Sequence, residues 1–105
     1  MKGDKFTVTP VSSNASKSSP LRIKLDGSRI MSVSIINTAN SVGNLMVGVN
    51  DDSVIIPLEP GDSLPLAGRD DAYLTGFILV YWDEAATTKQ ARIITGKDEG
   101  EIKDC

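Results

Sequence analysis

The chain contains no histidine, and its one cysteine is the final residue, Cys105. Histidine is the side chain that most often acts as a general base near neutral pH, so the common hydrolytic triads cannot form. A single cysteine excludes an intramolecular disulfide. Cys105 therefore either has no special role or forms an intermolecular disulfide or crosslink. The chain also lacks zinc-ligand spacing, a phosphate-binding glycine loop and a dinucleotide fingerprint. We predict a protein that is not an enzyme, with no catalytic residue, no metal and no cofactor.

Aromatic residues make up only 5% of the chain, and no apolar run approaches the roughly 20 residues that span a membrane. The first five residues include three charged side chains and no apolar leader follows them, so we expect no signal peptide and no membrane association. The aromatics are not interleaved with lysines and no dense basic stripe occurs, which argues against specific nucleic-acid binding. We expect synthesis in a cytoplasm.

The formal net charge of −3 is unevenly distributed. Residues 1–29 carry six basic and two acidic side chains, whereas residues 30–105 carry five basic and twelve acidic ones. Two interpretations stay open. Either the charges solvate loops and strand faces, or the basic N-terminal part docks on an oppositely charged partner.

The chain is rich in short apolar stretches of about five to ten residues that alternate with turn residues. The expected strands cover residues 5–9, 21–25, 29–37, 45–49, 54–58, 63–66, 72–82 and 91–95. Seven or eight short strands with frequent turns are typical of a sandwich or barrel. We therefore predict an all-β fold, an antiparallel β-sandwich that is jelly-roll-like or partly barrel-like. Pro57 predicts an edge strand, and Pro10 either ends its strand or confines it to an edge.

Three parts of the chain are expected to differ in character. Residues 1–19 form an N-terminal arm with a polar loop, in which residues 12–19 (SSNASKSS) have nothing to bury. Residues 20–96 form the single-domain β-sandwich body, and residues 97–105 form a charged, frayed tail. We expect that removing residues 1–19 would leave a folded body.

Alternation assigns side chains to faces. In residues 72–82 both faces are apolar, which favours a strand covered on both sides, with a buried helix as the alternative. Trp82 is expected in the core and Tyr81 nearer the surface. In residues 29–37, the face that carries Ile30, Ser32, Ser34 and Ile36 should meet solvent or a subunit.

Several elements follow one another in a recognisable order along the body. They are Ile35-Ile36-Asn37, then Leu45-Met46-Val47-Gly48-Val49, then the turn segment Ile56-Pro57-Leu58-Glu59-Pro60-Gly61-Asp62-Ser63-Leu64, and then Ala72-Tyr73-Leu74. Together they resemble a small β-sandwich found among virion proteins of tailed bacteriophages. The resemblance covers roughly residues 30–95 and leaves out the arm and the tail.

The resemblance implies a non-enzymatic structural component of a tailed-phage virion, either a capsid decoration protein or a head or tail accessory protein. It implies protein–protein contacts with other virion proteins (the major capsid or tail proteins), a homo-oligomer, and location in the virion after synthesis in the host cytoplasm. The alternative is a binding module that recognises another virion protein or a host-surface glycan, the latter through Tyr73, Tyr81 or loop carboxylates.

Seven residues are candidates for assembly contacts, because they combine basic charge with apolar side chains outside the expected core. These candidates are Lys5, Phe6, Val8, Lys17, Arg22, Lys24 and Tyr81. In the arm, Phe6 and Val8 alternate as in a strand that adds to a neighbour's sheet edge.

Two further patterns have plain explanations. Gly61-Asp62-Ser63-Leu64 matches the nucleophile block of an esterase family, but that chemistry needs a base that this chain lacks, and the segment is expected to be a turn entering a strand. The acidic pairs at residues 51–52, 70–71 and 83–84 are expected in solvated turns, with a loop-bound Ca²⁺ as the open alternative.

Overall fold

The computed structural model describes residues 2–27, 29–50, 55–67 and 73–101. These residues form eight strands. They are β1 (Lys2–Pro10), β2 (Leu21–Lys24), β3 (Ile30–Asn37), β4 (Leu45–Val49), β5 (Ile55–Leu58), β6 (Ser63–Ala67), β7 (Phe77–Trp82) and β8 (Ala91–Glu101). No helix occurs in these ranges. The prediction of an all-β protein is confirmed, and the helical alternative for residues 72–82 is excluded where those residues are described.

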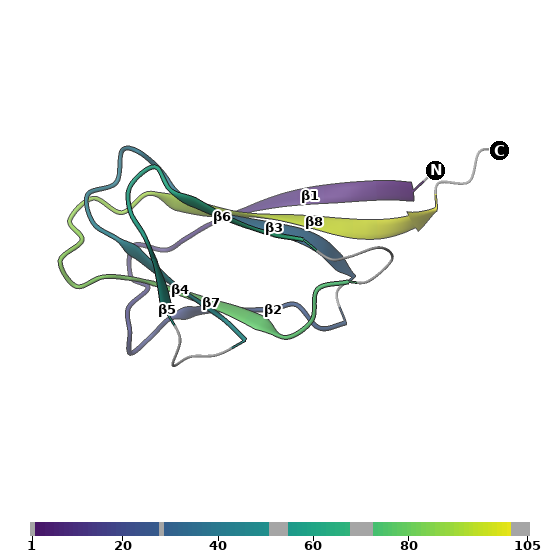
Figure 1. Cartoon of the computed structure of the whole chain (residues 1–105), viewed down its shortest axis with the longest axis horizontal. Coiled ribbons are helices and arrows are strands. Elements are labelled where there is room, and N and C mark those ends of the chain that lie inside the picture. The colour runs from purple at the N-terminus through teal and green to yellow at the C-terminus, as the bar shows by residue number, and fades with distance from the viewer. Residues whose placement is uncertain (1, 28, 51–54, 68–72, 102–105) are drawn as a thin grey trace.

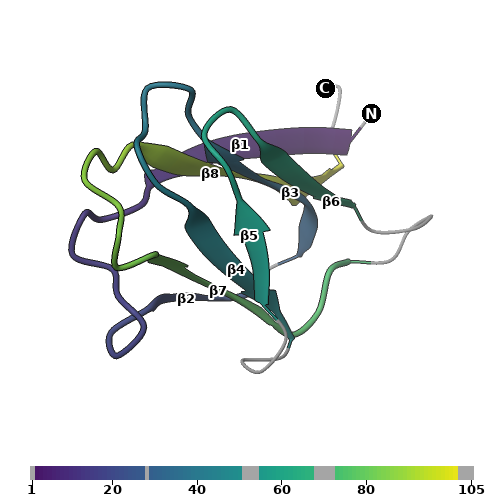
Figure 2. The same cartoon turned by 60° about the vertical axis from the view of Figure 1, so that its left-hand side comes forward.

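The strands form two four-stranded sheets that face each other (Figures 1 and 2). The first sheet has the order β1-β8-β3-β6 and the second sheet has the order β2-β7-β4-β5. Every neighbouring pair is antiparallel. The arrangement is sandwich-like, and β1, β6, β2 and β5 are the four edge strands. The edge position predicted from Pro57 is confirmed, and β1, which ends at Pro10, is also an edge strand.

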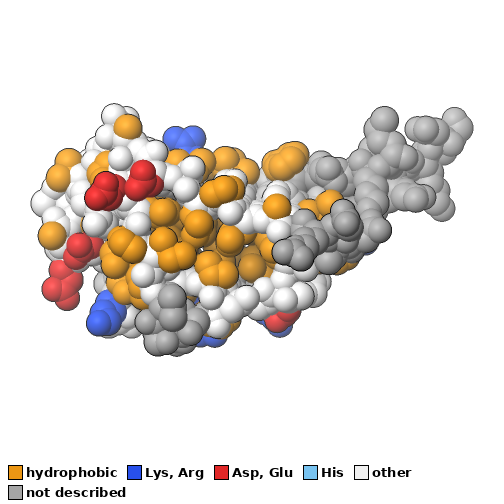
Figure 3. Space-filling view, viewed as in Figure 1, with side chains coloured by type: hydrophobic (Ala, Val, Ile, Leu, Met, Phe, Trp, Pro, Cys, Tyr) orange, Lys and Arg blue, Asp and Glu red, His pale blue; other side chains and the backbone are white. Residues whose placement is uncertain are grey.

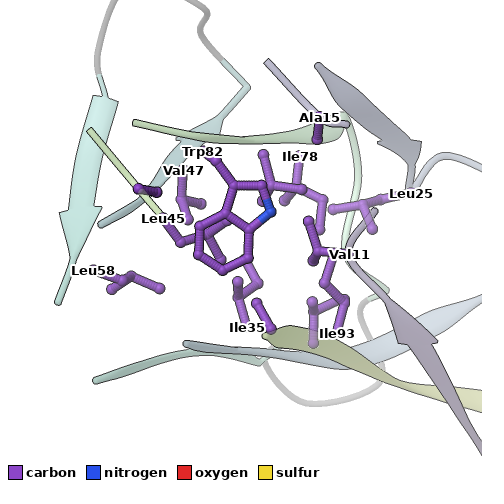
Figure 4. Packing of buried hydrophobic residues seen from close by; sticks show 14 of the residues in the cluster. Val11, Ala15, Leu25, Ile35, Leu45, Val47, Leu58, Ile78, Trp82 and Ile93 are labelled. Atoms are coloured by element: carbon purple, nitrogen blue, oxygen red, sulfur yellow. The ribbon is translucent and has the colours of Figure 1, made fainter. Parts of the chain in front are cut away.

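The core lies between the two sheets and draws on the inward residues of each. Trp82 of β7 is only 2% exposed, and its ring points toward Ile35 of β3 (Figure 4). Val33, Ile35 and Ile93 of the first sheet and Val47 of the second are fully buried. The period-2 pattern of apolar side chains therefore predicted the inward faces.

The long apolar run forms a shorter strand than predicted. Gly76 has a φ of 87°, a conformation that other residues rarely adopt, and β7 begins only at the next residue. The N–H of Gly76 donates to Asp26 Oδ1 at 2.8 Å, and its carbonyl accepts from the N–H of Leu25 at 2.8 Å. The bond from Leu25 continues the register of β2 with β7, whereas the positive φ of Gly76 ends the extended conformation, so β7 does not continue to residues before Phe77.

One face assignment in β3 is wrong at its first residue. Ser32, Ser34 and Ile36 lie on the outward face as predicted, but Ile30 is 6% exposed and belongs to the core. The pairing of β3 with β8 shifts register between Ile30 and Ser32. An extra residue at such an irregularity reverses the alternation, so Ile30 points inward.

The segments at the two chain ends are paired with each other. Residues 2–10 of the predicted arm form β1, which lies along β8, and β8 continues through residues 97–101 of the predicted tail. This two-stranded ribbon projects beyond the other strands (Figure 1). The division of the chain into arm, body and tail stays a prediction.

The expectation that residues 12–19 have nothing to bury is wrong. Ala15 is 6% exposed and Val11, just before the loop, is also in the core. The indole N–H of Trp82 donates to Ser12 O at 3.1 Å, and the backbone N–H of Trp82 donates to Ala15 O at 3.1 Å. The loop closes one end of the core. Its backbone also supplies the acceptor that the indole N–H of Trp82 requires.

Candidate assembly surface

From Phe6 onward along β1, the outward face of the first sheet contains few charged residues. The register places on it Phe6, Val8 and Pro10 from β1, Arg92, Ile94 and Gly96 from β8, Ser32, Ser34 and Ile36 from β3, and Ser63, Pro65 and Ala67 from β6. Within this set only Arg92 is charged. We call this set the outer face of the first sheet.

Phe6 and Val8 are the most exposed large apolar side chains on the outer face, at 67% and 57%. Phe6 pairs with Gly96 across the sheet, and a Cβ at Gly96 would lie 3.1 Å from Phe6 Cε1. The glycine thus leaves room for the ring to lie on the sheet. Together with Met31 and Ser32 these two residues line a hollow of about 210 Å³. Exposed aromatic side chains beside an apolar strand are typical of protein–protein contact surfaces.

A second hollow, of about 500 Å³, lies at the opposite end of β1. Its lining includes Val8, Pro10, Thr38, Lys89 and Arg92. Lys89 Nζ donates to Ser13 O at 3.2 Å, which ties the lysine to the loop after β1. The hollow therefore continues from the exposed side chain of Val8 to the two cations Lys89 and Arg92.

The predicted contact residues lie in three separate places. Phe6 and Val8 lie together on the outer face of the first sheet, and Lys5 belongs to the same strand, at the position opposite Lys97. Arg22 and Lys24 belong to β2 in the other sheet, because the connection after β1 crosses from one sheet to the other. The set is therefore not one site.

Arg22 and Lys24 flank an aromatic side chain on the outward face of the second sheet. The guanidinium carbon of Arg22 lies 3.9 Å from the ring centroid of Phe77, and Lys24 is paired with Phe77 in the register. Arg22, Lys24 and Phe77 line a hollow of about 440 Å³ with Asp26 and Gly76. Contacts of this kind hold a cation on an aromatic face.

Tyr81 and Lys17 lie close together at another place on the second sheet. They line a hollow of about 320 Å³ together with Met46, Asp83 and Glu84. Tyr81 is half-buried, whereas its neighbour Trp82 is in the core, as predicted from strand alternation. An aromatic ring beside two carboxylates and a lysine offers both a flat apolar face and hydrogen-bonding groups.

A further apolar surface lies on the side where β5 and β6 are the sheet edges. Figure 3 shows hydrophobic side chains gathered over the middle of this view. Ile56 is 39% exposed, and Leu64, Leu66 and Leu74 are partly buried against the core. The sequence did not indicate these residues as contact residues, because exposed and buried apolar residues on an edge strand follow the same alternating pattern.

The other candidate chemistry is limited in the described residues. Ser63 begins β6 directly after a turn in which Asp62 N–H donates to Glu59 O at 2.9 Å, as predicted for this segment. Residues 51–52 and 70–71 lie outside the described residues, and only the pair Asp83 and Glu84 is described. In the described ranges no three metal-ligating side chains cluster. In the described residues, no helix is long and apolar enough to cross a membrane.

Comparisons with protein-family models, with curated proteins and with solved structures found no match for this chain.

Proposed function

We propose that the protein is a non-enzymatic structural component of a tailed-phage virion, a capsid decoration or head or tail accessory protein that acts through contacts with other virion proteins. The observation that carries the proposal is the exposure of Phe6 and Val8 on the outer face of the first sheet. Burying such side chains against a partner removes apolar area from water at about 25 cal/mol per Å², so a contact there is favourable.

The residues that carry the family resemblance occupy consistent positions in the fold. Ile36 and Asn37 end β3, residues 45–49 are β4, and the Pro-Gly-Asp-Ser turn joins β5 to β6. These elements follow one another between residues 36 and 63. That each motif coincides with a strand or a turn of one sandwich supports the proposal.

We also propose that the sandwich is a jelly roll. The strand pairs β4–β5, β3–β6, β2–β7 and β1–β8 are all antiparallel neighbours. All four pairs belong to one long antiparallel hairpin. Strands β1 to β4 form one arm of this hairpin, strands β5 to β8 form the other, and the chain turns at the connection between β4 and β5. The remaining pairs, β3–β8 and β4–β7, join the layers of that hairpin when it is rolled into two sheets. Eight strands rolled in this way support the jelly-roll assignment.

The proposal is tested on particles made from the genome that encodes the chain. Particles are purified on a density gradient and probed with an antibody against the chain. We expect the chain to sediment with the particles, and we expect the Phe6→Ser/Val8→Ser double variant to be lost from them. The matched control is Val42→Ser, which removes a side chain that is 56% exposed and lies outside the first sheet, and it should leave incorporation unchanged. A wild-type chain found only in the unsedimented fraction contradicts the proposal.

A second candidate function is favoured by the hollow at Tyr81. An aromatic ring, two carboxylates and Lys17 in one hollow of about 320 Å³ suit a sugar, which stacks on the ring and hydrogen-bonds to the polar groups. Tyr73, the other tyrosine considered for this role, accepts hydrogen bonds from the Arg29 guanidinium at 3.3 and 3.4 Å. A glycan array with the wild-type chain and the Tyr81→Ala variant tests this candidate. Signal that is lost in the variant supports it, and no signal contradicts it.

A further inference from the structure

The four free sheet edges differ in how well they are protected against pairing with another chain. β5 contains Pro57 and β6 contains Pro65, and a proline removes one N–H from the row of donors at an edge. β2 has only four residues, two of which are the exposed cations Arg22 and Lys24. β1 is nine residues long. Its charged residues are confined to its first four positions and its only proline is the last residue, so residues 6–9 form an edge segment with neither a charge nor a proline. This segment is the least protected edge in the described structure.

The direction of the backbone groups in β1 follows from one hydrogen bond. Val11 N–H donates to Ala91 O at 3.0 Å and continues the register in which Pro10 pairs with Arg92. Backbone groups of alternate residues in an antiparallel strand point to opposite sides. Thr9 and Thr7 therefore point toward β8, whereas Phe6 and Val8 present their N–H and C=O groups at the free edge. Pro10, which has no N–H, also points outward.

This edge is complementary to itself. When two copies of β1 are placed antiparallel about a two-fold axis at Thr7, Phe6 of one copy pairs with Val8 of the other, and both residues have outward backbone groups. Aromatic and β-branched side chains make favourable cross-strand pairs. The same register places Lys5 opposite Thr9 of the second copy, so no two like charges face each other.

Neighbouring registers are less favourable. An axis at Phe6 places Val8 opposite Asp4 of the second copy, and an axis at Lys5 places two lysines opposite each other, which is destabilising. An axis at Val8 pairs Phe6 with Pro10, which lacks an N–H. The axis at Thr7 is the register in which both apolar side chains meet apolar partners and all of their backbone groups find partners.

We propose that two copies of this chain pair through their β1 edges, antiparallel and centred on Thr7. The pairing joins two first sheets into one continuous eight-stranded sheet, with Phe6 and Val8 of both copies clustered on its outer face. A two-fold interface of this kind is closed, because each copy uses the same patch and leaves no second copy of that edge free. The pairing rests on the chain alone and would hold whether or not the chain is part of a virion.

The register is tested by disulfide trapping in a Cys105→Ser background. At the two-fold axis the Cα atoms of the two Thr7 residues form a non-hydrogen-bonded pair about 4.5 Å apart, within the range of a disulfide. We expect Thr7→Cys to crosslink to a dimer under mild oxidation. Thr9→Cys is the matched control, because in this register its two copies are separated by about 13 Å along the strand. A lack of crosslinking at residue 7, or equal crosslinking at both positions, overturns the proposal.

The hydrogen bonding is tested by sedimentation equilibrium of the full chain. Val8→Pro removes an N–H that the β1–β8 pairing does not use, so the chain should fold and its dimer dissociation constant should rise on the order of 30-fold, because two intermolecular hydrogen bonds are lost. Val8→Thr, which keeps the N–H, is the control and should stay largely dimeric. If Val8→Pro does not fold, as judged by circular dichroism, Phe6→Ser serves instead, because it removes an exposed side chain without changing the backbone.

The outcomes separate this proposal from the proposed function. A wild-type chain that sediments as a monomer at all concentrations, or a Val8→Pro chain that folds and has the same dimer dissociation constant as the wild type, overturns the β1 pairing alone. A chain that pairs as described but is absent from purified particles contradicts the virion role alone.

Discussion

At the scale of single residues, Asn37 connects the end of β3 to the loop before β4 and to the turn between β5 and β6. It is fully buried at the end of β3, and its Nδ2 donates to Leu58 O at 2.8 Å and to Gly43 O at 3.1 Å. Its backbone N–H donates to Asp62 O at 3.0 Å, and its carbonyl accepts from Gly61 N–H at 2.8 Å. One residue thus ties the loop before β4 to the turn between β5 and β6.

Replacing Asn37 by alanine should destabilise the fold by about 2 to 3 kcal/mol, because the buried carbonyl of Leu58 and the part-buried carbonyl of Gly43 lose their donor. The measurement is urea unfolding followed by the fluorescence of Trp82. Thr38→Ala is the matched control: the neighbouring side chain also donates to a backbone carbonyl, Gln90 O at 2.9 Å, but at a more exposed position. It should cost about 1 kcal/mol or less. Equal losses in the two variants would contradict the role assigned to Asn37.

At the scale of elements, β1 and the loop after it have different roles. β1 adds an edge strand and its exposed side chains to the first sheet, whereas Val11 and Ala15 belong to the core and residues 12–15 supply two acceptors to Trp82. The expectation that residues 1–19 are removable as one unit stays a prediction, and the burial of Val11 and Ala15 argues against it. We expect the boundary of the removable segment to lie between β1 and Val11.

Two truncations test that boundary. Deleting residues 1–8 should leave a cooperatively unfolding protein, because the core and the acceptors of Trp82 remain. Deleting residues 1–19 should abolish cooperative unfolding, since the deletion opens the core and leaves the buried indole N–H without an acceptor. Thermal unfolding followed by circular dichroism and by Trp82 fluorescence distinguishes the two. Cooperative unfolding of the longer deletion would show that the loop is dispensable.

At the scale of the whole molecule, the β1–β8 ribbon makes the chain elongated. The molecule measures 53 × 27 × 20 Å, and its radius of gyration of 14.7 Å exceeds the value of about 13 Å expected for a compact chain of this length. The ribbon extends the free edge of β1 away from the sandwich. A second copy can therefore approach that edge with little obstruction from the rest of the fold.

Amide hydrogen exchange tests the pairing across the whole chain at once. In dilute solution the amides of Thr7 and Thr9 should be protected by β8, whereas those of Phe6 and Val8 should exchange fast at the free edge. At high concentration the Phe6 and Val8 amides should become protected as well, and the amides at the proline-bearing edges of β5 and β6 should not change. Exchange at Phe6 and Val8 that is independent of concentration would count against the pairing.

Much of the fold was predictable because alternation in a strand is a local property. The inward positions of Val33, Ile35 and Val47 and the burial of Trp82 follow from a period of two residues and need no knowledge of the partner strand. Pro57 likewise marked β5 as an edge, because a missing N–H cannot be replaced inside a sheet. The bulge at Ile30 and the break at Gly76 were not predictable, since both depend on contacts with strands and loops far along the chain.

The order of residues alone specifies the all-β class and the inward side chains of most strands, and it contains no histidine for catalysis. Three features depend on the three-dimensional fold. The fold leaves some strands as unprotected edges, and it places Phe6 and Val8 on one exposed face while Arg22 and Tyr81 lie elsewhere. It also brings the loop after β1 to one end of the core. The physical reason is that strand alternation is set by neighbouring residues, whereas free edges and shared faces arise from hydrogen bonding between segments that are distant in the chain.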